Sequence, residues 1–339
     1  MISSSLSRGS EHSFPEKSKE PGRSAKTVRA MSKGKLLFGV VICALLAAVP
    51  ALAGPYFGFV VGLALINCVA ATGINISMGY AGLVSVGHAG FAAIGAYATV
   101  LLMTHLGVSY FLAILLASAI AATCGIIIAI PSLRLSSLYI AMITFGFGQA
   151  VNLVLMNWLE LTRGPNGLAV PPIQVFGHEV QPVLMYYFLI GAFLCALWIS
   201  WNLLSSRFGR ALLALKGNEA AAESMGIPVA RYKIAAFALG ALFGGLSGSL
   251  YVGVSDFINP YAFSFEVSIA YLTMSVVGGL GVFWGPVFGA SLLTVLPELL
   301  RPVAEYKELV FGSLLLIFLI VMPEGIAPLI GRGVGRLRR

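Results

Sequence analysis

The sequence predicts an all-α integral membrane protein, a polytopic helical bundle of about ten transmembrane helices with one short helix outside the membrane. Three observations predict this class. Of the 339 residues, 58% are hydrophobic and 10% are charged, whereas soluble domains carry about 25% charged residues. Apolar runs of about 20 residues recur along the chain, and the basic residues between them are unevenly distributed. A secreted protein, a soluble enzyme and a disordered scaffold are therefore excluded.

The apolar runs are long enough to cross a bilayer, whose hydrocarbon core of about 30 Å needs roughly 20 residues of helix. A membrane barrel would instead show short stretches of alternating polarity. Two spans are less regular, because the third begins in a glycine-rich stretch and the ninth is short. The ten predicted spans are 36–53, 56–76, 80–103, 108–130, 138–159, 184–204, 234–254, 265–283, 286–300 and 309–329.

The basic residues predict the orientation of these spans. With the N-terminus inside, ten spans return the C-terminus to the inside. All but three of the 21 Lys and Arg residues then lie on the inner side, as the positive-inside rule requires. The exceptions are Arg163, Arg301 and Lys307. The net charge of +8 is thus a topology signal rather than a nucleic-acid footprint, and both termini are predicted to be cytoplasmic.

The chain divides into a membrane domain over 36–330 and two tails. The tail at 1–35 is polar, Ser-rich and basic without hydrophobic periodicity, which is typical of a disordered cytoplasmic segment. The tail at 331–339 is short and basic. Two segments between spans are longer than tight turns. One is external and proline-rich, at about 160–183, and the other is the internal loop 205–233.

The internal loop 205–233 contains the pattern of a short helix. Asn218 is a favoured N-cap residue, and Glu219 in the first turn suits the positive end of the helix dipole. Gly226 can adopt the left-handed conformation of a helix end, and Pro228 prevents continuation. The spacing predicts a helix of about two turns, which is too short to be stable without a surface to pack on.

The residues alone leave two interpretations of that surface open. The helix packs on its own protein, or it docks on a cytoplasmic partner. For the second interpretation, Ala220, Ala221 and Ala222 permit close approach, and Met225 offers an adaptable apolar contact.

A glycine-rich stretch at 75–91 lies where the second predicted span meets the third. Glycines permit close backbone approach and a broken helix, which a membrane tolerates only where it is buried in protein or lines a cavity. Polar side chains at membrane depth are candidates for lining a pathway. A hydrogen bond to a neighbouring helix explains them at least as well. The glycines are Gly79, Gly82, Gly87 and Gly90, and the polar residues are Asn75, Ser85 and His88.

A second glycine-rich stretch, at 278–290, joins the eighth and ninth predicted spans and includes Gly278, Gly279 and Gly281. Neither stretch is a nucleotide site, because phosphate-binding loops follow a strand. The single Gly-Lys pair, Gly34-Lys35, lacks the remaining residues of a P-loop.

The sequence offers no catalytic motif, and we predict no catalytic residue, metal or cofactor. Any ATP hydrolysis must belong to another chain. The cysteines lie in apolar runs without metal-ligand spacing. They are Cys43, Cys68, Cys124 and Cys195.

Three pieces of the loop 205–233 resemble the cytoplasmic coupling loop of permease subunits in branched-chain amino acid ABC importers. They are Gly209-Arg210-Ala211-Leu212, Asn218-Glu219-Ala220-Ala221-Ala222 and Met225-Gly226-Ile227. Both glycine-rich stretches are similar to signatures of the same family, and the resemblance covers roughly 36–330. Two departures stand out. Gly226 follows Glu219 by seven positions, not the six usual in ABC importers generally, and Lys216-Gly217 replaces the Arg-Asp usual in this family.

The resemblance implies a location in the bacterial inner membrane and a set of partners. These are a second homologous permease subunit, two cytoplasmic ABC ATPase subunits and a periplasmic substrate-binding protein, with no nucleic acid. It assigns ATPase coupling to Gly209, Arg210, Asn218, Glu219, Ala220, Ala221, Met225 and Gly226. The pathway candidates are Asn75, Gly79, Gly82, Ser85, Gly87, His88, Gly278, Gly279 and Gly281.

Leucine, isoleucine and valine are the cargo that the family implies, and urea or short amides are the alternative, since relatives carry them. Other classes also stay open, namely a secondary transporter, a passive channel and a membrane scaffold. The acids Glu266, Glu298 and Glu324 lie near span ends. A proton- or sodium-coupled carrier more often buries an acid at mid-membrane, which tilts against secondary transport without excluding it.

Overall fold

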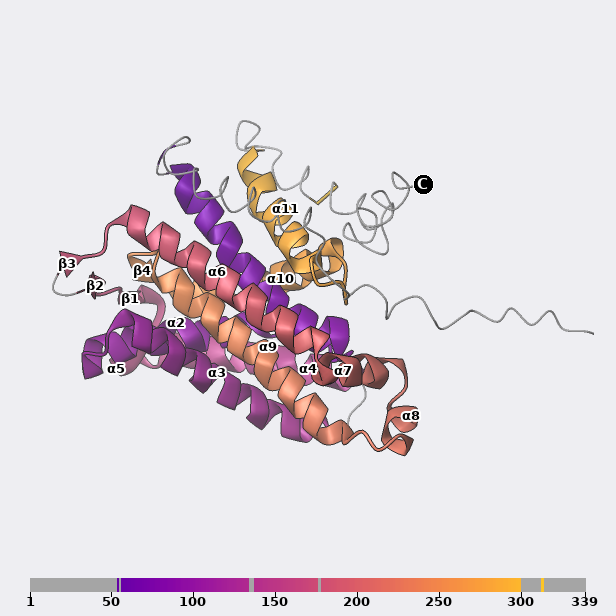
Figure 1. The fold of residues 1–339 in the computed structure, drawn as a ribbon. Helices are drawn as coiled ribbons and strands as arrows, with labels where there is room; N and C mark the ends of the chain where they lie inside the picture. Colours follow the sequence, from indigo (N-terminus) through magenta and orange to yellow (C-terminus); the bar gives the residue numbers. More distant parts are fainter. Residues whose placement is uncertain (1–53, 55, 134–136, 176–177, 300–311, 314–339) are drawn as a thin grey trace, which may run out of the picture. The chain divides into compact units, whose positions relative to one another are not determined.

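The computed structural model describes residues 54, 56–133, 137–175, 178–299 and 312–313, and its long elements are all helices (Figure 1). Among these residues, seven helices are long and apolar enough to cross a membrane. The seven are a first helix at Tyr56–Tyr80, α2 at His88–Leu106, α3 at Tyr110–Ser132, α4 at Ser137–Asn157, α6 at Pro182–Ser205, α9 at Val229–Val252, and α10 at Phe265–Gly278, which is counted together with the short turn before it. A shorter helix, α11, follows at Gly285–Leu299.

The helical, polytopic class is confirmed, and seven predicted spans coincide with the seven membrane-length helices. The span predicted at 286–300 is α11, which has 15 residues. The spans at 36–53 and 309–329 lie outside the described residues, apart from 312–313. The two predicted tails also lie outside them. A count of ten therefore stays a prediction.

The predicted boundaries differ from the helix ends by up to five residues except at the start of the third span, where the error is larger. The third span was placed at 80–103, but α2 begins at His88. The first helix ends in a π-helical turn, η2, at Asn75–Tyr80. The chain at 81–87 is not helical, because Gly82 has a φ of +74° that no continuing helix can accommodate.

Short elements lie at the two ends of α6 and α9. At one end are α5 (Leu159–Thr162), η3 (Gly164–Asn166), β1 (Leu168–Ala169), β2 (Gln174–Val175), β3 (His178–Glu179), β4 (Phe257–Ile258) and η4 (Pro260–Phe263). At the other end are α7 (Arg207–Gly217) and α8 (Glu219–Ser224) (Figure 1).

Two antiparallel strand pairs tie the first of these ends together. In one pair Leu168 faces Ile258 and Ala169 faces Phe257. The other is the hairpin β2–β3, in which Gln174 faces Glu179. The pairing of β1 with β4 joins the segment after α5 to the segment after α9. Both segments therefore leave the helices on the same side.

The core is built around α9, which packs against α2 and α3. Small residues make this close packing possible. A Cβ placed on Gly95 would overlap the Gly245 backbone, and one placed on Gly248 would overlap the Ala92 carbonyl. The Ser249 hydroxyl of α9 donates to the Gly95 carbonyl across the contact, at 3.2 Å. The helices meet backbone to backbone at these positions.

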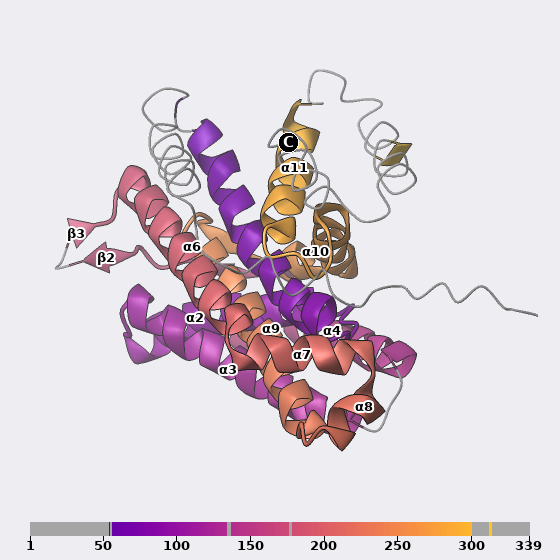
Figure 2. The same ribbon diagram turned by 45° about the vertical axis from the view of Figure 1, so that its right-hand side comes forward.

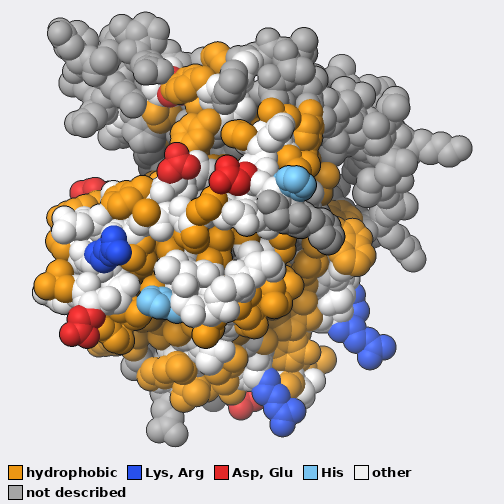
Figure 3. All heavy atoms as spheres, turned by 90° about the vertical axis from the view of Figure 1, so that its left-hand side faces the viewer, with side chains coloured by type: hydrophobic (Ala, Val, Ile, Leu, Met, Phe, Trp, Pro, Cys, Tyr) orange, Lys and Arg blue, Asp and Glu red, His pale blue; other side chains and the backbone are white. Residues whose placement is uncertain are grey.

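The outer faces of α3, α4 and α6 carry exposed apolar side chains. Charged side chains are few among the hydrophobic and uncharged ones on the face at the strand end (Figure 3). Of the seven membrane-length helices, α4 has the smallest buried share. A soluble monomer rarely exposes so much apolar surface. Examples of these exposed side chains are Leu112, Leu115, Ile127, Leu138, Met142 and Trp198.

Gly95→Ala should destabilise the bundle by about 1–3 kcal/mol, because the added methyl group has no space beside Gly245. The matched control is Gly191→Ala in α6, where nothing lies within 4 Å of the added Cβ. The measurement is the thermal unfolding midpoint of the purified protein in detergent. Equal midpoints for the two variants would contradict the packing at Gly95.

Candidate coupling site and membrane pathway

The α7 helix is folded back against the end of α6. The Ser206 hydroxyl caps it by accepting the Phe208 N–H at 3.1 Å. Gly209 is buried, and a Cβ there would overlap the Leu204 carbonyl. Arg210 is exposed and donates from Nη1 to the Ser205 carbonyl at 3.3 Å, so it supplies a partner for a carbonyl at the end of α6. The first motif of the loop thus fixes the turn between α6 and α7.

The short helix predicted from Asn218 to Gly226 is confirmed as α8. The Asn218 side chain accepts the Ala221 N–H at 3.0 Å, as an N-cap does. Gly226 has a φ of +80°, the left-handed conformation expected at the helix end. Its role in coupling stays a prediction.

The exposed face of α8 differs in one respect from expectation. Ala220 and Ala221 are exposed, and the Met225 side chain is 82% exposed. Ala222 was grouped with them as a residue for close approach to a partner, but it is buried. A helix of six residues turns one side toward its own protein, and Ala222 lies on that side. The apolar residues free for contact are Ala220, Ala221 and Met225, beside the exposed Glu223 and Ser224.

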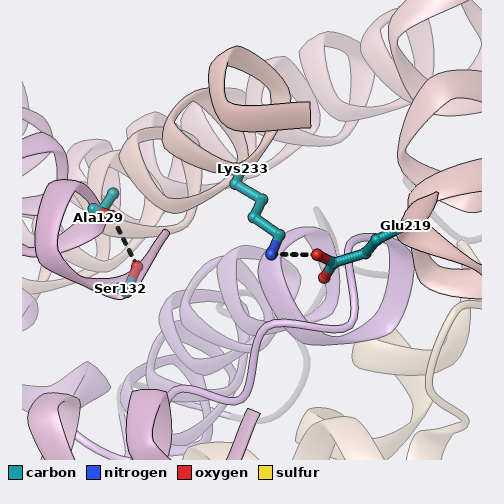
Figure 4. A network of polar contacts seen from close by, with 4 residues as sticks. All are labelled: Ala129, Ser132, Glu219 and Lys233. Carbon is teal, nitrogen blue, oxygen red and sulfur yellow. Dashed lines mark hydrogen bonds and ion pairs between the residues drawn. The ribbon is translucent and has the colours of Figure 1, made fainter. Parts of the chain in front are cut away.

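An ion pair connects α8 to the core. The Lys233 ammonium donates to a Glu219 carboxylate oxygen at 2.6 Å, and the two side chains point toward one another beside the end of α3 (Figure 4). Lys233, in the second turn of α9, has only 4% of its side chain exposed, whereas Glu219 has 56%. A buried ammonium needs such a partner, so the pair holds the start of α8 against α9.

A second lysine connects α7 to the first helix. Lys216, in the last turn of α7, donates from Nζ to the Gly79 carbonyl at 2.7 Å. Gly79 belongs to the π-helical turn η2, which ends the first helix. Desolvation by partial burial lowers the pKa of Lys216. The two residues lie 137 positions apart in the sequence.

The two glycine-rich stretches meet at Asn75. Its Oδ1 accepts the Gly281 N–H at 2.8 Å, and its Nδ2 donates to the Val282 carbonyl at 2.9 Å. Gly79 lies directly against this contact, with no room for a Cβ beside the Gly281 nitrogen. The structure therefore brings together Asn75, Gly79 and Gly281, which the sequence nominated separately.

The remaining glycines of the second stretch shape the turn between α10 and α11. Gly278 ends α10, and a Cβ there would overlap the Gly285 carbonyl at the start of α11. Gly279 and Gly281 have φ values of +116° and +78°. The tight turn needs these conformations, which are strained for other residues.

Side-chain hydroxyl groups of two other helices accept hydrogen bonds from backbone N–H groups in and directly after the interruption at 81–87. The Val86 N–H donates to Thr144 Oγ1 of α4, and the Ala89 N–H donates to Ser268 Oγ of α10, both at 3.0 Å. Gly87 packs against the Thr144 backbone, where a Cβ would overlap the carbonyl. This broken segment is thus buried in protein, as a membrane requires.

Ser85 lies inside this interruption and His88 directly after it, and each is 1% exposed. Among the described residues, neither Ser85 Oγ nor His88 Nε2 has a partner in hydrogen-bond geometry, although the Ala70 backbone lies within reach of the His88 ring. The imidazole of His88 lies close to Gly73 and Gly244, where an added Cβ would approach Nε2 to 3.0 and 3.1 Å. No group of His, Cys, Asp and Glu in the described part of the chain is placed to hold a metal ion.

Sequence reasoning missed the contacts of Lys216, Lys233, Thr144 and Ser268. For Lys233 a signal existed, because it directly precedes the uncharged run 234–252 that completes α9. Lys216 stands out only as the residue that replaces the family's usual one before Asn218. Nothing local marks Thr144 or Ser268, which act on segments 58 and 179 positions away.

The membrane-length helices and their exposed apolar side chains define an integral membrane protein of the helical class. The family described as branched-chain amino acid transport system, permease component, matches residues 56–319. This chain belongs to that family.

The relatives of this chain carry permease names. It is 32% identical over 292 residues to the high-affinity branched-chain amino acid transport system permease protein LivM of Escherichia coli, covering 79% of this chain and 69% of that one. It is 26% identical to a probable LivM of Methanocaldococcus jannaschii, over 75% of this chain and 88% of that one. It is also 29% identical to the Escherichia coli permease protein LivH, over 52% and 60%. No solved structure matches.

Asn75→Asp should destabilise the contact between the glycine-rich stretches by about 1–3 kcal/mol, because the carboxylate cannot donate to the Val282 carbonyl. The matched control is Asn202→Asp, at an exposed position of α6. Thermal unfolding in detergent measures both. The Asn75 assignment fails if its variant unfolds at the control's temperature.

Proposed function

We propose that this chain is the membrane-spanning permease subunit of an ABC importer, with no ATPase site of its own. It translocates branched-chain amino acids that an external binding protein delivers. The family membership carries this proposal. The permease works with a second homologous permease subunit, two cytoplasmic ATPase subunits and the binding protein, in the bacterial inner membrane. The names of LivM and LivH support leucine, isoleucine and valine as cargo.

We propose ten spans for the membrane domain over 36–330, with both termini cytoplasmic. Contacts between segments support this topology. Lys216 in the predicted inner loop touches Gly79 at the predicted inner end of the first helix. At the opposite end, β1 and β4 pair, and both come from predicted external segments. Segments predicted for one side of the membrane therefore meet each other, which an odd number of spans between Gly79 and Lys216, or between β1 and β4, would prevent. The outermost spans of the proposed ten rest on hydropathy alone.

The exposed face of α8 is the proposed docking surface for an ATPase subunit. It offers Ala220, Ala221 and Met225, and the Glu219–Lys233 ion pair holds it against α9. The coupling assignments to Gly209, Arg210, Asn218 and Gly226 are structural in this proposal, since these residues shape α7 and α8.

The proposed pathway lies near the interruption at 81–87. Buried polar atoms without a partner mark places where a polar ligand or water can bind. Four such atoms occur among the described residues. Ser85 Oγ and His88 Nε2 lie at this interruption, whereas Tyr97 OH and Ser200 Oγ lie within α2 and α6.

Fusion reporters test the topology. A reporter after residue 170 should read external, and one after residue 215 should read internal, because the basic residues are concentrated on the proposed inner side. The reverse pattern would overturn the proposed orientation.

Uptake tests the function. The permease reconstituted in vesicles with its partner subunits should take up labelled leucine, isoleucine or valine, and uptake should require both ATP and the binding protein. Labelled urea is the competing substrate. Uptake without ATP would instead favour a channel or a secondary transporter.

The combined variant Glu219→Lys with Gly226→Val should abolish ATP-driven uptake and binding of the ATPase subunits. The ammonium introduced at position 219 would face the buried Lys233 ammonium, and valine does not readily adopt the positive φ at 226. Glu160→Lys, an exposed charge reversal at the strand end, is the matched control. Pull-down and uptake are measured at equal permease abundance. If the combined variant binds the ATPases and transports as the control does, α8 is not the docking element.

A further inference from the structure

Lys216 occupies the carbonyl end of the first helix. The last carbonyls of a helix have no partner within it, and that end carries partial negative charge. Lys216 Nζ supplies both a donor and a positive charge there, at 2.7 Å from the Gly79 oxygen. The contact is made from a different element, α7, so it joins two parts of the chain that no backbone connection holds together.

The Lys216 side chain lies against positions that have no side chain. A Cβ placed on Gly82 would lie 3.5 Å from Lys216 Cγ, and one placed on Gly281 would lie 3.5 Å from Nζ. An added Cβ at either position would be in ordinary van der Waals contact with Lys216, so the lysine side chain passes directly beside both glycines on its way to the Gly79 carbonyl. Because Asn75 joins the same helical turn to Gly281 and Val282, a displacement of Lys216 acts on the first helix and on the α10–α11 turn together.

The neighbouring contact, the Glu219–Lys233 ion pair, connects α8 to a different helix. Glu219, three positions after Lys216, is bound to Lys233 on α9, which packs against α2 and α3. Only Gly217 and Asn218 separate Lys216 from α8. In Figure 2 α7 lies beside the η2 end of the first helix, drawn in indigo, with α8 at its far end. The α7–α8 element is thus held at two points, on the first helix through Lys216 and on α9 through Glu219, and these two helices also pack against each other.

We propose that Lys216 is the positioning residue that transmits movement of the α7–α8 element to the first helix and the α10–α11 turn. The Glu219–Lys233 ion pair transmits the same movement to α9. The inference rests on the proposed function, because it requires a partner that moves α8. It assigns transmission to a residue outside the docking face, so docking and transmission can be separated by experiment.

The test uses Lys216→Met, which keeps the length of the side chain and removes the ammonium. The full complex is reconstituted with the second permease, the ATPases and the binding protein. We expect ATPase binding to stay at the wild-type level. Stimulated ATP hydrolysis and uptake should fall roughly tenfold, the shift that the loss of one charge-assisted hydrogen bond produces. Arg231→Met, which removes another exposed cation at the start of α9, is the matched control and should transport normally.

Chemical rescue distinguishes transmission from a folding defect. Lys216→Cys should show the same loss, and 2-bromoethylamine should restore stimulated hydrolysis by rebuilding a side chain with a terminal ammonium. Iodoacetamide, which adds a neutral group, should not restore it. Wild-type protein treated with each reagent controls for the native cysteines.

Each other outcome has one reading. Normal uptake by Lys216→Met overturns the inference and leaves the proposed function intact. Loss of ATPase binding in that variant, or no rescue by the amine, also overturns it, because Lys216 would then only stabilise the loop. Absence of ATPase binding by the wild-type chain overturns the proposed function itself.

Discussion

The interruption between the first helix and α2 imposes the constraint on which the other contacts depend. Backbone N–H and C=O groups at membrane depth must find partners inside the protein. The Leu83 N–H turns back to the Ser77 carbonyl at 2.9 Å, whereas Val86 and Ala89 donate to hydroxyl groups of α4 and α10. Two helices that are distant in the sequence, α4 and α10, therefore supply hydrogen-bond acceptors for the backbone at this interruption. They must lie close enough for short hydroxyl side chains to reach it. The break organises the helices around it.

This closeness explains why the glycines serve two different purposes. At Gly87 the φ is negative, and the requirement is space beside the Thr144 backbone. At Gly82 the nearest atoms are 3.5 Å from an added Cβ, which is ordinary contact, and the requirement is the positive φ. Of the two reasons that the sequence argument gave for these glycines, close backbone approach and a broken helix, only the second applies at Gly82. At Gly281 both requirements apply, because the Gly79 carbonyl lies 2.9 Å from an added Cβ.

The features that the sequence predicted are those with a local cause. Hydropathy over about 20 residues locates a membrane helix, and α8 follows from its cap at Asn218 and its left-handed Gly226. The glycines at 79–90 indicated that the helix can break here, but the start of α2 was misplaced because the residues at 81–87 are apolar enough to be counted in a span. Asn75 and Val282 are 207 positions apart. The residues around Asn75 and Val282 contain no signal that the two pair. Polarity at membrane depth can therefore mark a residue such as Asn75 as a candidate, but it cannot predict which residue is its hydrogen-bond partner.

The polar pathway candidates differ in whether their side-chain polar atoms are already hydrogen-bonded within the protein. Asn75 uses its oxygen and its amide group on the α10–α11 turn, so its polarity is explained by holding that turn. Ser85 Oγ and His88 Nε2 are equally buried and have no partner in hydrogen-bond geometry among the described residues, although the Ala70 backbone lies within reach of the His88 ring. Burial of an unpaired polar atom costs free energy, so Ser85 is the residue whose polarity the packing leaves unexplained. Ser85 lies inside the non-helical segment 81–87, and His88 follows it at the start of α2. A polar ligand or water beside this segment would satisfy Ser85 Oγ, which is why the proposed pathway is placed there.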